Sequence, residues 1–276
     1  AYIDRIHGGY ASGFKSRGTH YLAGEAKFID NHTVEVDGVQ YTAPHIAIVP
    51  GGRPRLIDLP GIDLVDTSDD FFEWETLPES VLIIGAGYVA TEFAGVLNGL
   101  GVKTSQAVRH DRPLRGYDQA IIEVLVDEMK KTGIELLTES DPESIEQLAD
   151  GSLRVNFKNG QHADAEKVIY AIGRTPNTDN IGLENTDVKL TKSGHIKVDD
   201  YHNTNVEGLY AFGDVIGKVE LTPVAIMAGR TLSDTIFNGA DPYLLDYDTV
   251  PTVIFTHPAI GSIGYSEEAA KEKFGA

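Results

Sequence analysis

The chain contains no cysteine among its 276 residues. Disulfide bonds within the chain and thiolate metal sites are therefore excluded, and so is a cysteine nucleophile supplied by this chain alone. No apolar run is long enough to predict a membrane-spanning helix, and the N-terminus lacks a signal-peptide pattern. We therefore expect a cytoplasmic protein with no membrane partner.

Positive charge is also scarce, with 23 Lys and Arg residues against 42 Asp and Glu residues and a net charge of −19. Such an acidic balance disfavours nucleic acid and anionic membrane surfaces as partners. The length allows two domains with an ample core, and the composition is ordinary for a soluble globular protein. Against this background, a local group of arginines within residues 109–115 stands out.

A glycine-rich motif lies between a predicted strand and a predicted helix. Residues 81–84 are an apolar β run, residues 85–90 read Gly-Ala-Gly-Tyr-Val-Ala, and an apolar helical pattern then continues to Gly99. The glycines permit a tight turn and close approach of a pyrophosphate to a helix N-terminus, and Ala90 takes the place of the third glycine. The motif in this context predicts dinucleotide binding; the alternative is a βαβ unit with a glycine turn and no ligand.

The end of the second predicted strand indicates which dinucleotide is bound. An NAD site usually places Asp or Glu about 20 residues after the motif, to hold the ribose 2′-hydroxyl. This chain has no acidic residue between Glu92 and Asp111, and instead carries Arg109, His110, Arg112 and Arg115. Guanidinium groups bind a 2′-phosphate through paired hydrogen bonds, so the pattern predicts NADPH. The alternative is a solvated basic loop.

The remaining pattern alternates strands with helices and favours an α/β class. The turn at Asp37-Gly38 is a strong hairpin signal, the aromatic residues of the first helical segment are interpreted as core packing, and Thr222 is predicted to be an N-cap. Helices are expected at 1–16, 117–131, 222–238 and from 266 onward. Strands are expected at 21–23, 27–29, 33–36, 39–41, 45–49, 134–137, 152–157, 167–171 and 209–212, with two short ones within 250–264.

Several segments, taken in this order, resemble the bacterial glutathione reductases, which belong to the flavoprotein disulfide reductases (the class I pyridine nucleotide-disulfide oxidoreductases). The likeness extends essentially from Tyr2 to Ser266. The segments that carry it are residues 85–90, 108–115, 171–174, 213–214, 221–225 and 255–258.

The resemblance implies an α/β fold in which a Rossmann-type NAD(P)-binding domain is inserted in a partial FAD-binding domain. The expected domains are a partial FAD-binding domain at 1–52, an NADPH-binding Rossmann domain at 53–177, the remainder of the FAD-binding domain at 178–247, and the start of a dimerisation domain at 248–276. We expect the family's N-terminal FAD-binding unit and redox-active cysteine pair to lie upstream of Ala1, and most of the interface domain beyond Ala276.

The resemblance also assigns roles to single residues. Tyr88 would cover the flavin and move aside for the nicotinamide, Glu92 would lie near the nicotinamide amide, and Gly173 would contact the adenosine part. Glu220 and Val253 would border the nicotinamide. The complete nucleotide-binding set implied is Gly85, Ala86, Gly87, Tyr88, Val89, Glu92, Arg109, His110, Arg115, Gly173, Arg174, Glu220 and Val253.

For FAD, the resemblance implies that Asp214 accepts a hydrogen bond from a ribitol hydroxyl. Thr222 would place the start of its helix against the flavin pyrimidine, where a helix N-terminus stabilises negative charge. Tyr10 and Arg230 would contact glutathione disulfide, Arg230 by pairing with a carboxylate. His257 is interpreted as a structural or interface-forming residue, so no catalytic residue of the family is assigned to this chain.

The activity implied is the NADPH-dependent reduction of glutathione disulfide, a step of redox homeostasis, by a homodimer that uses FAD and a cysteine pair. Without cysteine, the chain alone is expected to be inactive in that reaction, and FAD would lose its main adenine and pyrophosphate site without the upstream unit. The alternatives are a non-catalytic NADPH-binding module and another NADPH-dependent flavoprotein oxidoreductase.

The chain departs from the family pattern at several positions. Pro50 removes a backbone N–H close to the expected flavin, and Phe212 is bulkier than the residue expected before Gly213. The second strand of the nucleotide unit, Thr104-Ser105-Gln106-Ala107-Val108, is less apolar than a buried parallel strand should be.

Overall fold

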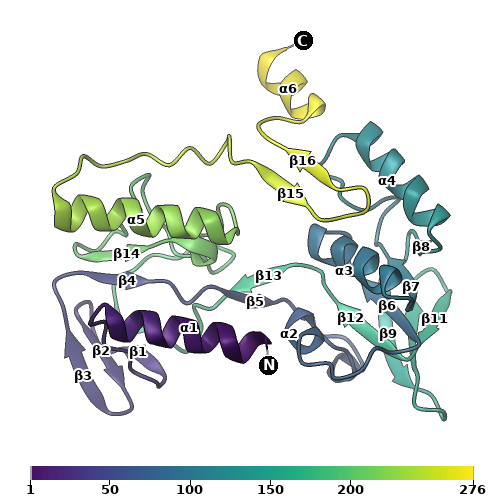
Figure 1. Cartoon of the computed structure of the whole chain (residues 1–276), viewed down its shortest axis with the longest axis horizontal. Helices are drawn as coiled ribbons and strands as arrows, with labels where there is room; N and C mark the ends of the chain where they lie inside the picture. Colours follow the sequence, from purple (N-terminus) through teal and green to yellow (C-terminus); the bar gives the residue numbers. More distant parts are fainter. Residues whose placement is uncertain (1, 276) are drawn as a thin grey trace. The chain divides into compact units, whose positions relative to one another are not determined.

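The computed structural model describes residues 2–275 and divides the chain into two compact units (Figure 1). Unit 1 comprises Ala1–Gly51 and Pro176–Leu244, and unit 2 comprises Gly52–Thr175 and Leu245–Ala276. Within the described residues, none of the helices combines the length and the apolar character needed to cross a membrane.

Unit 1 combines an antiparallel sheet, a parallel strand pair and two long helices. The sheet has the order β1-β2-β3, and β4 pairs with β14 in parallel. The turn between β2 and β3 has positive φ at both Asp37 and Gly38, which is the geometry that the hairpin signal predicted. The elements of this unit are α1 (Tyr2–Ser16), β1 (Ala26–Phe28), β2 (Thr33–Val36), β3 (Val39–Thr42), β4 (Ile46–Ile48), η2 (Leu183–Asn185), β14 (Leu209–Ala211), η3 (Gly213–Ile216) and α5 (Thr222–Asn238).

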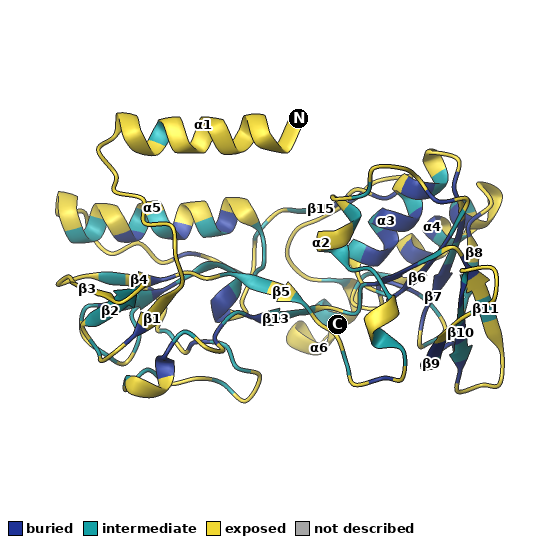
Figure 2. Cartoon of the chain, turned by 90° about the horizontal axis from the view of Figure 1, so that it is seen from below, coloured by how far each residue is buried: buried dark blue, intermediate teal, exposed yellow. Residues whose placement is uncertain are grey.

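The helix α1 has no buried residue, and Figure 2 shows it in the colour of exposed residues along almost its whole length. Tyr2 is 67% exposed and Tyr10 is 66% exposed, so the interpretation of these aromatic residues as core packing is wrong for this structure. Their spacing correctly indicated a helix with an apolar side, but spacing alone does not show whether another element covers that side.

Unit 2 is built on a parallel sheet with the order β12-β6-β7-β8. A second, antiparallel sheet has the order β11-β10-β9, and β15 pairs with β16. The elements are β5 (Gly52–Pro54), η1 (Ile62–Leu64), α2 (Ser68–Phe71), β6 (Ser80–Ile84), α3 (Tyr88–Gly99), β7 (Lys103–Ala107), α4 (Gln119–Lys131), β8 (Glu135–Leu137), β9 (Pro142–Gln147), β10 (Leu153–Phe157), β11 (His162–Ala165), β12 (Lys167–Tyr170), β15 (Thr252–Ile254), β16 (Ile260–Ser262) and α6 (Glu267–Phe274); β13 (Arg174–Pro176) pairs with β5.

The central strand β6 explains how this unit is layered. Val81 and Ile83 pack with residues of α3 and α4, whereas Leu82 and Ile84 pack with residues of β9 and β10. Side chains of a strand alternate between the two faces of its sheet, so a strand that is covered on both faces must be apolar at every position. The uninterrupted apolar run at 81–84 is therefore required by the two layers that enclose it.

Two local predictions need correction. Residues 21–23, predicted to be a strand, have no regular secondary structure. The N-cap of α5 is Leu221 rather than Thr222, because the Leu221 carbonyl accepts the first helical bonds, from the N–H groups of Val224 (3.0 Å) and Ala225 (3.1 Å). Pro223 then lies in the first turn, where its missing N–H costs nothing.

The residues from 248 onward, predicted to begin a dimerisation domain, pack in unit 2. A backbone N–H of Glu267 donates to the carboxylate of Asp118 over 2.6 Å, and Ile254 and Ile260 join the cluster around α3. Their assignment to a separate domain stays a prediction.

The burial of α3 predicts the effect of truncating its core face. Leu97 is fully buried, so Leu97→Ala should lower the free energy of unfolding by about 2–5 kcal/mol. Val96, the preceding residue, is 40% exposed, so Val96→Ala should change it by about 0.5 kcal/mol or less. Urea unfolding of the chain measures both; equal losses would contradict the packing of α3 described here.

Candidate functional site

The turn that follows β6 lies at the carboxyl ends of the parallel strands. It lies at the point where the order of the strands in the sheet reverses relative to their order in the chain. β6 is flanked by β7 on one side and by β12 on the other. In open α/β sheets, the crevice outside the carboxyl ends of the strands at such a point is where ligands bind. The residues of the predicted glycine motif therefore lie at a favourable position for a nucleotide.

Gly85 and Gly87 serve this turn in different ways. Gly85 has φ 149°, and a Cβ atom at this position would lie 2.1 Å from the carbonyl oxygen of Ala171. A Cβ at Gly87 would meet no atom within 4 Å, and α3, which begins one residue later, has no side-chain hydrogen bond at its N-cap. The first residue permits the backbone approach, and the second leaves open space before a helix N-terminus, which suits an anion.

A cleft of about 300 Å³ opens at this turn. It brings together five residues of the predicted nucleotide site: Gly85, Ala86, Gly87, Arg109 and His110. The structure adds residues that the motif did not indicate: Arg55, Ile57, Ile84, Ala107, Ser140, Asp141, Pro142, Tyr170 and Ile172.

The arginines near the end of β7 are not equivalent. Arg109 lines the cleft, is exposed, and makes no ion pair within residues 2–275. Arg112 is engaged by Asp111, with 3.1 Å between Nη1 and Oδ2, and Arg115 is not part of the cleft lining. Backbone bonds hold the segment that carries Arg109, since Ser140 donates to the Val108 carbonyl (2.9 Å) and Glu139 to that of His110 (3.0 Å).

An acidic residue also reaches this cleft. Asp141 follows β8. Its carboxylate oxygen lies 2.7 Å from Nζ of Lys158, and this ion pair offsets the negative charge of Asp141. The nucleotide motif points to an acid only at the end of the second strand. In a parallel sheet, the carboxyl end of the third strand lies at the same edge as that of the second. A search for charged residues after the third strand would therefore have found Asp141.

The other predicted nucleotide contacts in unit 2 lie outside the lining of this cleft. Tyr88, at the start of α3, is 38% exposed, with Val89 beside it, and Val253 on β15 is 51% exposed. The Glu92 carboxylate accepts a hydrogen bond from the N–H of Phe255 over 2.9 Å, which ties the end of β15 to α3. Two further predicted nucleotide contacts follow β12. Gly173 has φ 130°, and Arg174 donates a hydrogen bond to the carbonyl of Gly52.

A second concave surface lies along α5 in unit 1. This groove of about 680 Å³ brings together Asp214, Thr222 and Arg230, which the resemblance assigned to FAD and to glutathione disulfide. Phe212 also lines it and lies against Gly229, where a Cβ would be 3.1 Å from Cε2 of the ring. Glu220 is not among the lining residues, and Tyr10 lies on the exposed helix α1.

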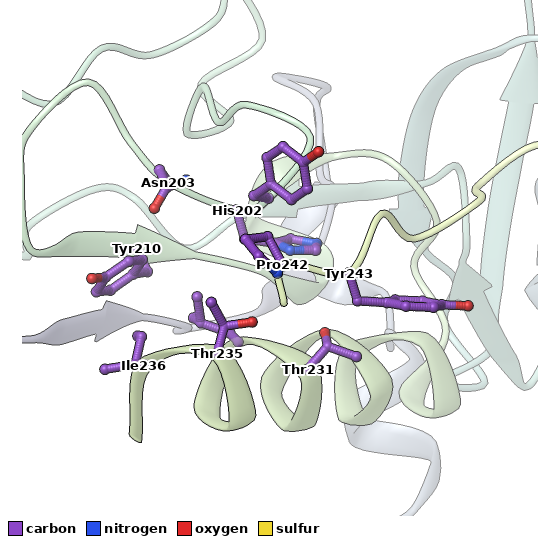
Figure 3. A pocket seen from close by; sticks show the side chains of 10 residues that line it. His202, Asn203, Tyr210, Thr231, Thr235, Ile236, Pro242 and Tyr243 are labelled. Atoms are coloured by element: carbon purple, nitrogen blue, oxygen red, sulfur yellow. The ribbon is translucent and has the colours of Figure 1, made fainter. Parts of the chain in front are cut away.

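A smaller pocket of about 220 Å³ on another side of α5 was not predicted. Figure 3 shows Thr231 and Thr235 of the helix facing Pro242 and Tyr243, with His202 behind them. His202 is 2% exposed and has φ 68°. Burial lowers the pKa of its imidazole from the usual 6.5, and the charge of Lys218 acts in the same direction.

Comparisons with known proteins agree with this arrangement. The family model for pyridine nucleotide-disulphide oxidoreductases matches residues 1–229. The glutathione reductase, chloroplastic/mitochondrial, of Pisum sativum is 39% identical over 275 residues, covering 100% of this chain and 50% of the relative. The chain thus spans about half the length of this curated relative.

Solved structures show the same fold. The HOCl-induced flavoprotein disulfide reductase RclA from Escherichia coli matches 92% of this chain and 59% of its own with a TM-score of 0.85 and 24% identity. Its Cu(II) complex matches the same shares with a TM-score of 0.86. The predicted fold class, an α/β FAD/NAD(P)-binding fold, is confirmed.

The backbone approach at Gly85 predicts a strong effect of a single methyl group. Gly85→Ala should lower the free energy of unfolding by about 3 kcal/mol or more, through strain at φ 149° and the clash with the Ala171 carbonyl. Gly87→Ala, with φ −86° and open space, should change it by less than about 1 kcal/mol. Urea unfolding distinguishes them, and similar values for both variants would contradict the turn geometry.

The buried imidazole of His202 predicts a dependence of stability on pH. Because its pKa is lowered in the folded state, the unfolded chain binds the proton first as pH falls below 6.5. The free energy of unfolding should then fall by up to about 1.4 kcal/mol per pH unit until the folded pKa is reached. His202→Asn, which tolerates positive φ, should remove this slope, whereas His7→Asn on exposed α1 should keep it; an unchanged slope in His202→Asn would refute the assignment.

Proposed function

Because the chain belongs to the pyridine nucleotide-disulphide oxidoreductase family, we propose that unit 2 binds NADPH and that the intact protein uses it, with FAD, to reduce glutathione disulfide. The observation that carries the cofactor is the cleft in which Arg109, without an ion pair among residues 2–275, lies beside the glycine turn, with no carboxylate at the end of β7. The substrate rests on the relative's name and its 39% identity.

The residues of unit 2 suit the two charged parts of NADPH. The turn of Gly85, Ala86 and Gly87 at the N-terminus of α3 would receive the pyrophosphate. Arg109, with His110 beside it, would bind the 2′-phosphate with charge-assisted hydrogen bonds. Arg115, which lies outside the cleft lining, stays a predicted second contact of the 2′-phosphate.

The groove along α5 suits the flavin end of FAD. The carboxylate of Asp214 is an acceptor for a hydroxyl group, and the start of α5 at Thr222 has no acidic residue in its first turn to repel negative charge on the ring. When bound, FAD supplies the two-electron chemistry, and the protein contributes binding and orientation. Arg230, in the same groove, would pair with a carboxylate of glutathione disulfide, and exposed Tyr10 would offer a second contact.

This chain has no cysteine, so a dithiol step would use residues outside it. We therefore propose that residues 1–276 contribute cofactor and substrate binding within a longer, homodimeric enzyme. Flavin absorption of the purified chain would contradict the alternative of a non-catalytic NADPH-binding module.

Nucleotide preference is the direct test of the proposed cofactor. The chain should bind NADPH more tightly than NADH, and Arg109→Ala should weaken NADPH binding about tenfold to a hundredfold, the contribution of hydrogen bonds to a charged group. The same variant should change NADH binding by less than about threefold. Titration by calorimetry or by nicotinamide fluorescence measures each dissociation constant.

Lys103→Ala is the matched control, because it removes the same charge from the opposite, exposed end of β7. It should leave the NADPH dissociation constant unchanged at physiological salt, where distant charges are screened. Equal affinity of the unmodified chain for NADPH and NADH would overturn the proposed cofactor.

A further inference from the structure

Gln106 is a polar residue in the middle of a strand where an apolar one is expected. It lies on β7 with 0% exposure, and its register partners on the two flanking strands are Ile83 and Leu136. A strand enclosed on both faces is normally apolar, and a buried amide is unfavourable unless hydrogen bonds compensate for the lost water. The side chain therefore calls for an explanation.

The amide nitrogen of Gln106 is directed at the glycine turn. Nε2 donates to the carbonyl oxygen of Gly85 over 2.9 Å and to Oγ1 of Thr91 over 3.3 Å. Because a carbonyl oxygen only accepts, the NH₂ group and not Oε1 must face Gly85. Oε1 has no hydrogen-bond partner in the part of the chain that the structure describes. The hydrogen bonds of this amide thus serve the turn and its helix.

Thr91 extends the same link to the next glycine. Its hydroxyl donates to the carbonyl of Gly87 over 3.0 Å while it accepts from Gln106. The carbonyl between them, that of Ala86, accepts from the N–H of Leu114 over 2.7 Å. Each carbonyl oxygen of the turn is therefore held by a group of the protein.

Holding these carbonyls fixes the direction of the amide N–H groups. In a planar trans peptide, the C=O of one residue and the N–H of the next point in opposite directions. The hydrogen bond from Gln106 to the Gly85 carbonyl therefore directs the N–H of Ala86 away from the Gln106 side chain on β7. Ala86 lines the cleft in which the pyrophosphate is proposed to bind.

We propose that Gln106 is a positioning residue for the pyrophosphate of the bound dinucleotide. It holds Gly85 directly, and Gly87 through Thr91, so that the amides of the turn are oriented before the ligand arrives. Preorganised donors bind an anion more tightly than donors that must be ordered during binding. This role rests on the proposed binding of NADPH and adds a residue that neither the glycine motif nor the arginine cluster indicates.

The test distinguishes an effect on pyrophosphate binding from an effect on 2′-phosphate binding. Gln106→Leu keeps an apolar side chain of similar size and removes the donor, so the dissociation constant for NADPH should rise about threefold to tenfold, the range of one hydrogen bond. The dissociation constant for adenosine 2′-monophosphate, which has no pyrophosphate and depends on Arg109, should stay within about twofold. Calorimetric titration measures both ligands on the same samples.

Thr104→Val is the matched control on the same strand. Thr104 is 1% exposed and donates to the carbonyl of Val102, a residue outside the turn. Thr104→Val should lower thermal stability and leave NADPH affinity unchanged, because it removes a buried hydrogen bond that does not reach the ligand site. Thr91→Val removes the hydroxyl that joins Gln106 to the Gly87 carbonyl, and it should also weaken NADPH binding. If Gln106→Leu does not fold, unchanged NADPH affinity in Thr91→Val overturns the positioning of the turn through Thr91.

The outcomes are distinct. If the unmodified chain does not bind NADPH, the proposed cofactor fails, and the role of Gln106 fails with it. If the unmodified chain binds NADPH and Gln106→Leu binds it equally well, the proposed function stands and the positioning role is overturned. An equal loss of affinity for NADPH and for adenosine 2′-monophosphate would also overturn it, because a general structural defect would weaken both.

Discussion

The close approach of two backbones at Gly85 is the constraint on which unit 2 depends. The carbonyl of Ala171, just beyond β12, occupies the space that a side chain at Gly85 would need. The close approach lets the ends of β6 and β12 stay joined, with the N–H of Ala171 donating to the Ile84 carbonyl over 2.8 Å, while the chain turns from strand to helix. The same turn leaves open space at Gly87 before a helix N-terminus, so the feature that packs the sheet also forms the place proposed to receive the pyrophosphate.

The layers around β6 restrain the turn that follows it. Helices α3 and α4 cover one face of the parallel sheet and the strands β9 and β10 cover the other. A turn at the end of a strand enclosed in this way has little freedom, and Gln106 and Thr91 restrain its carbonyl groups further. Residues held on such a support would lose less conformational entropy on binding the proposed ligand.

The interpretation of the sequence succeeded where the signal is local. The strand, glycine turn and helix at 81–99 and the hairpin at Asp37-Gly38 follow from backbone chemistry that acts over a few residues. The interpretation failed where contacts between distant segments decide the burial or the position of a residue. The spacing of Tyr2 and Tyr10 could not show that α1 is uncovered, and Asp141 enters the cleft from the segment between β8 and β9, which the motif does not include.

By itself, the sequence determined the helix and strand pattern of the nucleotide unit, the absence of an acid at the end of β7, and the lack of any thiol. Only the tertiary structure decided that Arg109, rather than Arg112 or Arg115, lines the cleft, and that the amide of Gln106 faces Gly85. The physical reason is the distance along the chain over which each interaction acts. Motifs report backbone conformations set by neighbouring residues, whereas ion pairing and the direction of a buried amide depend on strands brought together by the sheet.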